Sequence, residues 1–248
     1  TIGSDRGLQL NGLKLSLLGK HQVENAGLAI EAVLQLEKFG LEITEEHIRK
    51  ALKTAFFPGR FEVVCFEGSP RPLNDSSNPN LKQSADLARA NISEHGSQDA
   101  LFKSSFRGEA RPRSYTVILD GAHNPTKMRA FLSTLKKLYP RNKKVFVIGF
   151  KNDKDIKSML RQILKVADIL IVTEFKAKTD MSNNASAEAL NIKHQTSNIK
   201  YDKKTQILIE GDSAKALEKA FELAETEKDS IIVVTGSLYL VGEVRNML

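Results

Sequence analysis

From residue 115 onward, short apolar runs of strand length alternate with amphipathic segments of helical periodicity. The predicted strands are Tyr115–Leu119, Lys144–Gly149, Asp168–Thr173, Gln206–Glu210 and Ser230–Thr235. The predicted helices lie near residues 125–138, 154–166, 186–192, 213–225 and 238–247. Alternation of this kind requires right-handed crossover connections, which place helices on both faces of a parallel sheet. The pattern therefore predicts an α/β fold with a doubly wound, mostly parallel, Rossmann-like sheet.

The first of these strands leads into a polar turn. Asp120 follows the apolar run directly, Asn124 suits a helix N-cap, and Pro125 suits the first helical position. Ligands of open α/β sheets bind beyond the carboxyl ends of strands, close to helix N-termini. Asp120 and His123 are therefore the first candidate site residues, although Asp120 is equally suited to cap the helix and His123 to be a hydrogen-bonded turn residue.

Two further polar turns follow strands, at residues 150–155 and 235–239. Parallel strands end at the same edge of a sheet, so all three turns are expected to converge on one rim. Lys154 and Ser237 are the candidates from these turns. The simpler interpretation of Lys154 and Asp155 is a pair of charges at a helix start, and that of Ser237 is a helix cap.

Residues 1–66 have a different pattern. Leucines alternate on both sides of Asn11-Gly12, which predicts a β-hairpin over residues 6–18 that would be the end of an antiparallel sheet. A helix ending near Gly40 and a second helix capped by Thr44 follow. The break at residues 56–60 places Arg60 before a strand at 61–66. Arg60 can form an ion pair with Glu62, and a residue such as Asn25 in a first helical turn is usually solvated.

Residues 67–113 contain four of the seven prolines and many serines, with few large apolar side chains. Such a composition buries too little apolar surface to offset the cost of ordering. We expect a disordered or irregular insertion, with at most a weak helix over residues 81–92.

Composition narrows the function classes. No apolar run approaches the roughly 18 residues of a membrane span, and the single cysteine excludes a disulfide framework. The net charge of +7 comes from lysines scattered in short pairs, which favours a solvated surface over nucleic-acid binding. We expect a cytoplasmic monomer that binds neither membrane nor nucleic acid. The sequence has no Gly-x-x-x-x-Gly-Lys-Ser/Thr phosphate loop and no spacing typical of a zinc site.

Taken together, five stretches carry a family resemblance. LLGKHQVENAGLAIEAV, FPGRFEVV, VILDGAHNP, the Lys154-Asp155-Ile156 turn and TGSLYLVGEVR resemble, in this order, the folylpolyglutamate synthase/dihydrofolate synthase family of ATP-dependent Mur-type ligases. The resemblance covers residues 13–66 and 114–248. It departs from the family in lacking the phosphate-loop domain and most of the central domain, and in replacing a short connection by residues 67–113. It implies a C-terminal fragment, with 1–66 the remnant of the ATP-binding central domain and 114–248 the C-terminal domain.

The resemblance also implies roles for single residues. Asn25 resembles a nucleotide contact, Arg60 the arginine that reaches the ATP phosphates, and Asp120 the carboxylate that holds the ribose hydroxyls. His123, Lys154 and Ser237 correspond to positions that bind the incoming glutamate. No catalytic or metal-ligating residue is assigned, because in this family the phosphate loop and the ligands of Mg²⁺ lie upstream.

The implied reaction is amide ligation. ATP phosphorylates the carboxylate of a folate or of dihydropteroate, and glutamate attacks the acyl phosphate. The chain alone is expected to be inactive, and the choice between the two acceptors stays open. The alternatives are a fragment of another Mur-type ligase, such as a cell-wall precursor ligase, and a non-catalytic module that binds a nucleotide or a protein partner.

Overall fold

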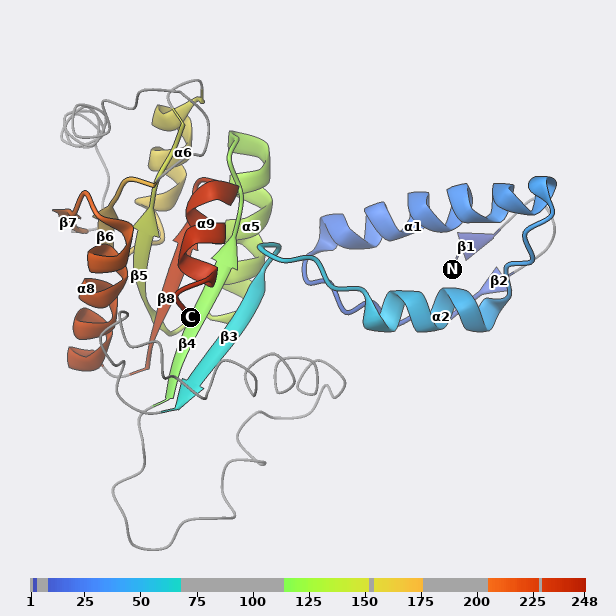
Figure 1. Ribbon diagram of the computed structural model, residues 1–248, viewed down its shortest axis with the longest axis horizontal. Helices are drawn as coiled ribbons and strands as arrows, with labels where there is room; N and C mark the ends of the chain where they lie inside the picture. Colours follow the sequence, from blue (N-terminus) through green and yellow to red (C-terminus); the bar gives the residue numbers. More distant parts are fainter. Residues whose placement is uncertain (1, 4–8, 68–113, 152–153, 176–204, 228) are drawn as a thin grey trace, which may run out of the picture. The chain divides into compact units, whose positions relative to one another are not determined.

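The computed structural model describes residues 2–3, 9–67, 114–151, 154–175, 205–227 and 229–248 (Figure 1). The weak helix expected at 81–92, the insertion after residue 67 and the helix expected at 186–192 lie outside these residues. The chain divides into two compact units, Thr1–Arg60 and Phe61–Leu248, which are described separately.

Among the described residues, the second unit is built on a sheet of six strands in the order β3-β4-β8-β5-β6-β7. The strands are β3 Glu62–Glu67, β4 Ser114–Asp120, β5 Lys143–Ile148, β6 Ile169–Val172, β7 Gln206–Ile209 and β8 Ser230–Thr235. All neighbours are parallel except the edge strand β3, which pairs antiparallel with β4. The predicted α/β fold with a mostly parallel sheet is confirmed.

Helices cover both faces of this sheet (Figure 1). They are α5 Pro125–Leu138, α6 Ile156–Ile163, α8 Ser213–Thr226 and α9 Leu238–Arg245. The apolar faces of α8 and α9 pack on alternate residues of the central strands, including Leu119, Val147 and Val234. Helices α5 and α6 contact each other and lie outside that cluster. The helices that follow β4 and β5 therefore lie on one face of the sheet, and the helix that follows β8 lies on the opposite face.

Each of these helices begins at a side-chain cap. Asn124 Oδ1 accepts from the Lys127 N–H at 2.9 Å, and Asp212 Oδ1 accepts from two N–H groups of α8 at 3.0 Å. Asp155 and Ser237 cap α6 and α9 in the same way. Caps satisfy N–H groups that have no partner within the helix, which is why these helices begin where they do.

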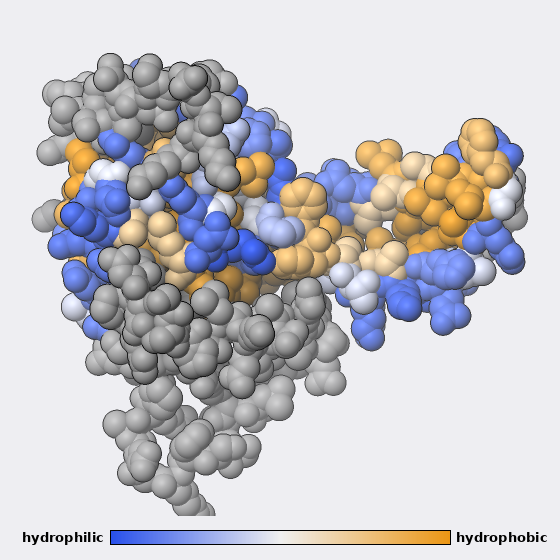
Figure 2. All heavy atoms as spheres, in the orientation of Figure 1, coloured by the Kyte–Doolittle hydropathy of each residue, from blue (hydrophilic) through white to orange (hydrophobic). Residues whose placement is uncertain are grey.

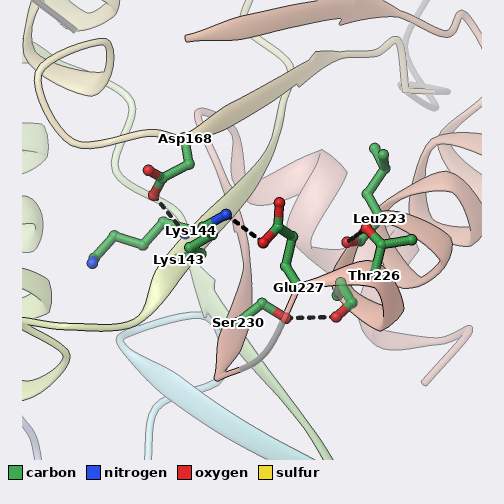
Figure 3. Close-up of polar contacts among 8 residues, drawn as sticks. Lys143, Lys144, Asp168, Leu223, Thr226, Glu227 and Ser230 are labelled. Atoms are coloured by element: carbon green, nitrogen blue, oxygen red, sulfur yellow. Dashed lines mark hydrogen bonds and ion pairs between the residues drawn. The ribbon is translucent and has the colours of Figure 1, made fainter. Parts of the chain in front are cut away.

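The amino ends of the strands are tied together by polar contacts (Figure 3). The Lys144 N–H donates to Asp168 Oδ2 at 2.9 Å, and the Ser230 hydroxyl donates to the Ala224 carbonyl at 2.8 Å. Lys143 forms an ion pair with Glu227. These contacts join β5 to the start of β6 and to the C-terminal end of α8, and they join β8 to the same end of α8.

The first unit has a small core. Its elements are β1 Ile2–Gly3, β2 Gln9–Leu10, α1 Lys20–Gln35, the 3-10 turn Leu36–Phe39 and α2 Glu45–Thr54. Leu10, Ile30 and Ile48 are buried together, while apolar side chains remain exposed around them (Figure 2). The exposed ones are Val23, Leu28, Leu36, Phe39, Leu41, Phe56 and Phe57. Thr44 caps α2 as predicted, through a reciprocal pair of hydrogen bonds with His47.

The predicted hairpin around Asn11-Gly12 is wrong. β2 pairs antiparallel with β1, and the residues after Gly12 run along α2 instead of forming a strand. Arg49 Nη2 donates to the Asn11 carbonyl at 2.8 Å, and the Ser16 N–H donates to the Leu52 carbonyl at 3.1 Å. The helix therefore supplies the polar partners that a second hairpin strand was expected to supply.

Strand β3 belongs to the sheet of the second unit. The expected boundary after residue 66 cuts through its pairing with β4, which runs from Glu62 opposite Leu119 to Glu67 opposite Ser114. The division into compact units falls between Arg60 and Phe61 instead, because this ladder joins β3 to β4 along its whole length.

Candidate functional site

The three polar turns that follow β4, β5 and β8 adjoin one another, and we call them the β8 rim. Thr235, the last residue of β8, lies in register with Asp120 on one side and with Ile148 on the other. The Gly149 N–H also donates to the Thr235 carbonyl at 3.4 Å. The expected convergence of these turns is confirmed. The rim lies where the chain changes from one face of the sheet to the other, which is the usual ligand position in such folds.

Glycines allow the turns of the β8 rim to approach closely. Gly236 has a φ of 105°, and a Cβ there would lie 2.6 Å from the Gly149 carbonyl oxygen. At Gly121 a Cβ would lie 2.1 Å from a methyl carbon of Leu238. A side chain at Gly236 would force the turns apart, and one at Gly121 would displace the Leu238 side chain. Neither requirement was recognised from the sequence.

Asp120 is 8% exposed, and both of its carboxylate oxygens accept backbone hydrogen bonds. Oδ1 accepts from the Ala122 N–H and Oδ2 from the Phe61 N–H, each at 2.9 Å. Asp120 does not cap α5, because Asn124 does. Carboxylate oxygens are acceptors, so the partners that suit them are donors such as N–H groups and hydroxyls.

His123 is a hydrogen-bonded turn residue. Its Nδ1 lies 2.8 Å from the Gly121 carbonyl oxygen, and its Nε2 lies 3.2 Å from the ammonium of Lys127. A carbonyl only accepts and an ammonium only donates, so this geometry requires a proton on Nδ1 and a lone pair on Nε2. A ligand that binds His123 through Nε2 has to displace or share Lys127.

Ser237 and Lys154 lie on the other two turns of the rim. Ser237 is 3% exposed, and its Oγ accepts from the Tyr239 N–H at 3.2 Å. Lys154 is half-buried, and its backbone N–H donates to the Lys151 carbonyl at 3.2 Å. The neighbouring Asp155 accepts from the Ser158 N–H at 3.1 Å, and hydrogen bonding to Ser158 lowers the pKa of the Asp155 carboxyl.

An aromatic group on the β8 rim was missed by the sequence reasoning. The rings of Tyr239 and Phe175 are nearly parallel with centroids 6.1 Å apart, and Lys151 Nζ lies 4.4 Å from the Tyr239 ring centroid. Cation–π contacts of this length hold an ammonium near one position. Nothing in the sequence pairs these residues, because they follow three different strands.

In the first unit, the chain reaches Arg60 through a tight turn. Pro58 and Gly59 are the central residues of the turn, and Gly59 has a φ of 67°. The Arg60 N–H donates to the Phe57 carbonyl at 3.2 Å, so the geometry matches a type II turn. The turn brings the Arg60 guanidinium to 5.7 Å from the Phe57 ring centroid. The alternative partner Glu62 forms an ion pair with Arg245 at 2.9 Å.

Two residues near the start of α1 complete the candidates of the first unit. Asn25 is exposed, and its Nδ2 donates to Gln22 Oε1 at 3.1 Å. Burial and the nearby charge of Arg60 lower the pKa of His21, against an opposing effect of Glu24. His21 was not singled out from the sequence, although it opens the same HQVENA stretch as Asn25.

The part of the chain that the structure describes contains no cluster of typical metal ligands. No group of three His, Cys, Asp or Glu side chains within the described ranges is arranged to hold a metal ion. No helix among them is long and apolar enough to cross a membrane. The groups of the β8 rim that can contact a ligand include backbone N–H groups, a carboxylate and lysines.

Comparison with known proteins identifies a family. A family model described as "Dihydrofolate synthetase, C-terminal domain" matches residues 105–247. A probable bifunctional folylpolyglutamate synthase/dihydropteroate synthase of Haloferax volcanii is 26% identical over 94% of the chain, which covers 20% of that protein. A dihydrofolate synthase/folylpolyglutamate synthase of Bacillus subtilis is 23% identical over 95% of the chain and 41% of its own length.

Solved structures agree on the fold. A Mycobacterium tuberculosis folylpolyglutamate synthase, crystallised with ADP and AMPPCP, is 22% identical with a TM-score of 0.61. The match covers 94% of this chain and 41% of that one. The chain thus spans less than half the length of each of these three relatives.

Proposed function

Because the chain belongs to the dihydrofolate synthetase C-terminal domain family, we propose that it forms part of an ATP-dependent ligase that adds L-glutamate to a folate, to dihydropteroate or to both. The observation that carries the proposal is the β8 rim, where three polar turns meet at the carboxyl ends of parallel strands. Helix N-termini at such an edge favour negative groups, which both ATP and glutamate carry.

We assign the nucleotide to Asn25, Arg60 and Asp120. A guanidinium matches phosphate oxygens with two parallel hydrogen bonds, and the turn at residues 57–60 presents Arg60 beside an aromatic ring. Asp120 lies at the carboxyl end of β4, and a carboxylate acceptor suits vicinal ribose hydroxyls, which are donors. Asn25 is exposed and offers both a donor and an acceptor.

We assign the amino-acid substrate to His123, Lys154 and Ser237. The Lys154 ammonium and the N-terminus of α9 at Ser237 both favour a carboxylate. His123 Nε2 accepts from a donor, so it suits the ammonium group of an amino acid in place of Lys127. These three residues bind and orient glutamate, and none is assigned a step that makes or breaks a bond.

The reaction we propose consumes one ATP for each amide formed. The acceptor carboxylate attacks the γ-phosphorus to give an acyl phosphate and ADP, and the amine of glutamate then attacks the acyl carbon. Phosphate leaves, and the amine loses a proton. Positioning and neutralisation of phosphate charge are the main demands of such chemistry. Within the described residues no group of three His, Cys, Asp or Glu side chains is arranged to hold a metal ion, so none of them is assigned to Mg²⁺.

The test is to titrate the chain with ADP and, separately, with L-glutamate while following backbone amide resonances. We expect ADP to shift the amides near Asp120 with an affinity of about millimolar, since no phosphate loop is present in the sequence. Glutamate should shift the amides of the β8 rim more than glutamine, which lacks the second carboxylate.

Matched lysine variants sharpen the glutamate experiment. Lys154→Met should weaken the response, whereas Lys157→Met, an exposed lysine on α6, should leave it unchanged. Equal responses to glutamate in both variants would remove Lys154 from the site. In a turnover assay with ATP, MgCl2, glutamate and dihydropteroate or tetrahydrofolate, we expect no phosphate release above background from this chain alone.

A non-catalytic nucleotide-binding module is the second candidate. It is favoured by the fact that both ring nitrogens of His123, a residue assigned to the amino acid, already contact groups of the protein. The two candidates differ in the amino-acid site, because the module should respond to ADP but not to glutamate. A chain from another Mur-type ligase should respond to a different amino acid.

A further inference from the structure

Phe61 has an unusual backbone conformation for its position. Its φ is 45°, in the left-handed region that residues other than glycine seldom adopt, and it immediately precedes β3. Its side chain is 5% exposed and packs with its ring centroid 5.5 Å from that of Phe131 in α5. A bulky residue stays in this region only when surrounding contacts hold it there.

Asp120 supplies such a contact. In the β3–β4 ladder Glu62 lies opposite Leu119, so Phe61 lies opposite Asp120, one residue beyond the last ladder pair. There the Phe61 N–H donates to the buried Asp120 Oδ2 at 2.9 Å. The other oxygen of the same carboxylate holds the Ala122 N–H at the start of the turn toward α5. One side chain thus fixes the start of β3 and the end of β4 together.

We propose that Asp120 is a positioning residue whose carboxylate holds Phe61 in its left-handed conformation and so fixes the backbone at the Arg60–Phe61 peptide bond. The link to phosphate binding rests on the proposed function, whereas the positioning itself does not. Arg60 is covalently joined to the nitrogen that Asp120 holds. A ribose bound at the same carboxylate would therefore act directly on the backbone next to the phosphate-binding arginine.

The carboxylate chemistry explains why an isosteric amide cannot replace Asp120. An aspartate oxygen accepts a hydrogen bond on each side, whereas an asparagine presents one acceptor oxygen and one donor NH2 group. In Asp120→Asn one of the two backbone N–H groups, of Phe61 or of Ala122, must face a donor. Charge-assisted bonds to a carboxylate are also stronger than bonds to a neutral amide.

The experiment compares backbone NMR spectra and amide exchange of the whole chain and of its Asp120→Asn variant. We expect the Phe61 amide to exchange at least about tenfold faster and the Phe61 carbon shifts to move away from left-handed values. Asp155→Asn is the matched control, because Asp155 also accepts a backbone N–H, from Ser158 in the first turn of α6. It should leave the Phe61 resonances unchanged.

A glycine at position 61 provides a second measurement. Glycine adopts positive φ without strain, so Asp120→Asn should cost less stability in a Phe61→Gly background than in the wild type. Unchanged Phe61 shifts and exchange in Asp120→Asn, or equal stability costs in both backgrounds, would overturn the positioning role. If those readouts change while ADP binding does not, the positioning role stands, and both the ribose contact of Asp120 and its link to phosphate binding at Arg60 fail.

Discussion

Replacing Gly236 by alanine tests whether close contact between the turns determines the β8 rim. The φ of 105° at Gly236 costs a residue with a side chain on the order of 1–3 kcal/mol. The added Cβ would also meet the Gly149 carbonyl oxygen at 2.6 Å and a ring carbon of Phe150 at 2.8 Å, and overpacking of this kind costs about 1–3 kcal/mol. We expect a loss of about 3 kcal/mol in the free energy of unfolding, in the lower half of the combined range of about 2–6 kcal/mol.

The assay is thermal unfolding, with amide signals of α9 reporting on the second unit. For a unit of this size a loss of about 3 kcal/mol corresponds to a fall of about 6–12 °C in Tm. Gly242→Ala is the control, since Gly242 lies within α9 and a Cβ added there would have no atom within 4 Å, so this variant should gain about 0.5–1 kcal/mol. A Gly236→Ala protein within about 0.5 kcal/mol of the wild type would refute the steric reasoning.

Three further outcomes are expected. The hydrogen bonds of Asp155 lower the pKa of its carboxyl in the folded protein. The stabilisation from this carboxylate is therefore present above the unfolded pKa of about 4 and is lost as pH falls through the folded pKa. The Tm difference between wild type and Asp155→Asn should shrink on acidification. Burial, with a smaller effect of Cys65, raises the pKa of Tyr139 to about 12. The free energy of unfolding should therefore fall as pH rises from about 10 to 12. In alkaline denaturation, Tyr139→Phe should lack this contribution to the fall. Arg49→Ala removes the guanidinium that donates to the Asn11 carbonyl, so the free energy of unfolding of the first unit should fall by about 1 kcal/mol. Faster amide exchange in α2 would measure this loss.

Most of the second unit could be predicted from local sequence patterns. Continuous apolar runs of strand length and helical runs at period 3.6 located the described strands and helices within a few residues, because burial on a parallel sheet dictates both patterns. Asn124 and Pro125 identified the start of α5 correctly, since a cap is a local interaction. The polar turns after the strands selected Asp120, His123, Lys154 and Ser237, and the family stretches added the roles of the candidate residues, which periodicity alone does not supply.

What escaped prediction depends on partners far away in the sequence. The Asn11-Gly12 signal is typical of a hairpin, but Arg49 and Ser16 tie this segment to α2, and no local rule anticipates that contact. The bond from Phe61 to Asp120 spans 59 positions. Stacking of Tyr239 on Phe175 likewise requires the strand order, which the sequence alone did not provide.

The position of β8 has a consequence for how the protein is made. Among the described strands, β4 and β5 do not pair with each other, and both pair with β8, the last strand to be synthesised. A nascent chain that ends before residue 230 can form only two separate pieces of sheet, β3-β4 and β5-β6-β7. Each piece would present an unpaired edge, which invites association with other chains. The ribosome therefore has to release residues 230–235 before the two halves can join, and premature termination shortly before them should yield an aggregating product rather than a smaller folded one.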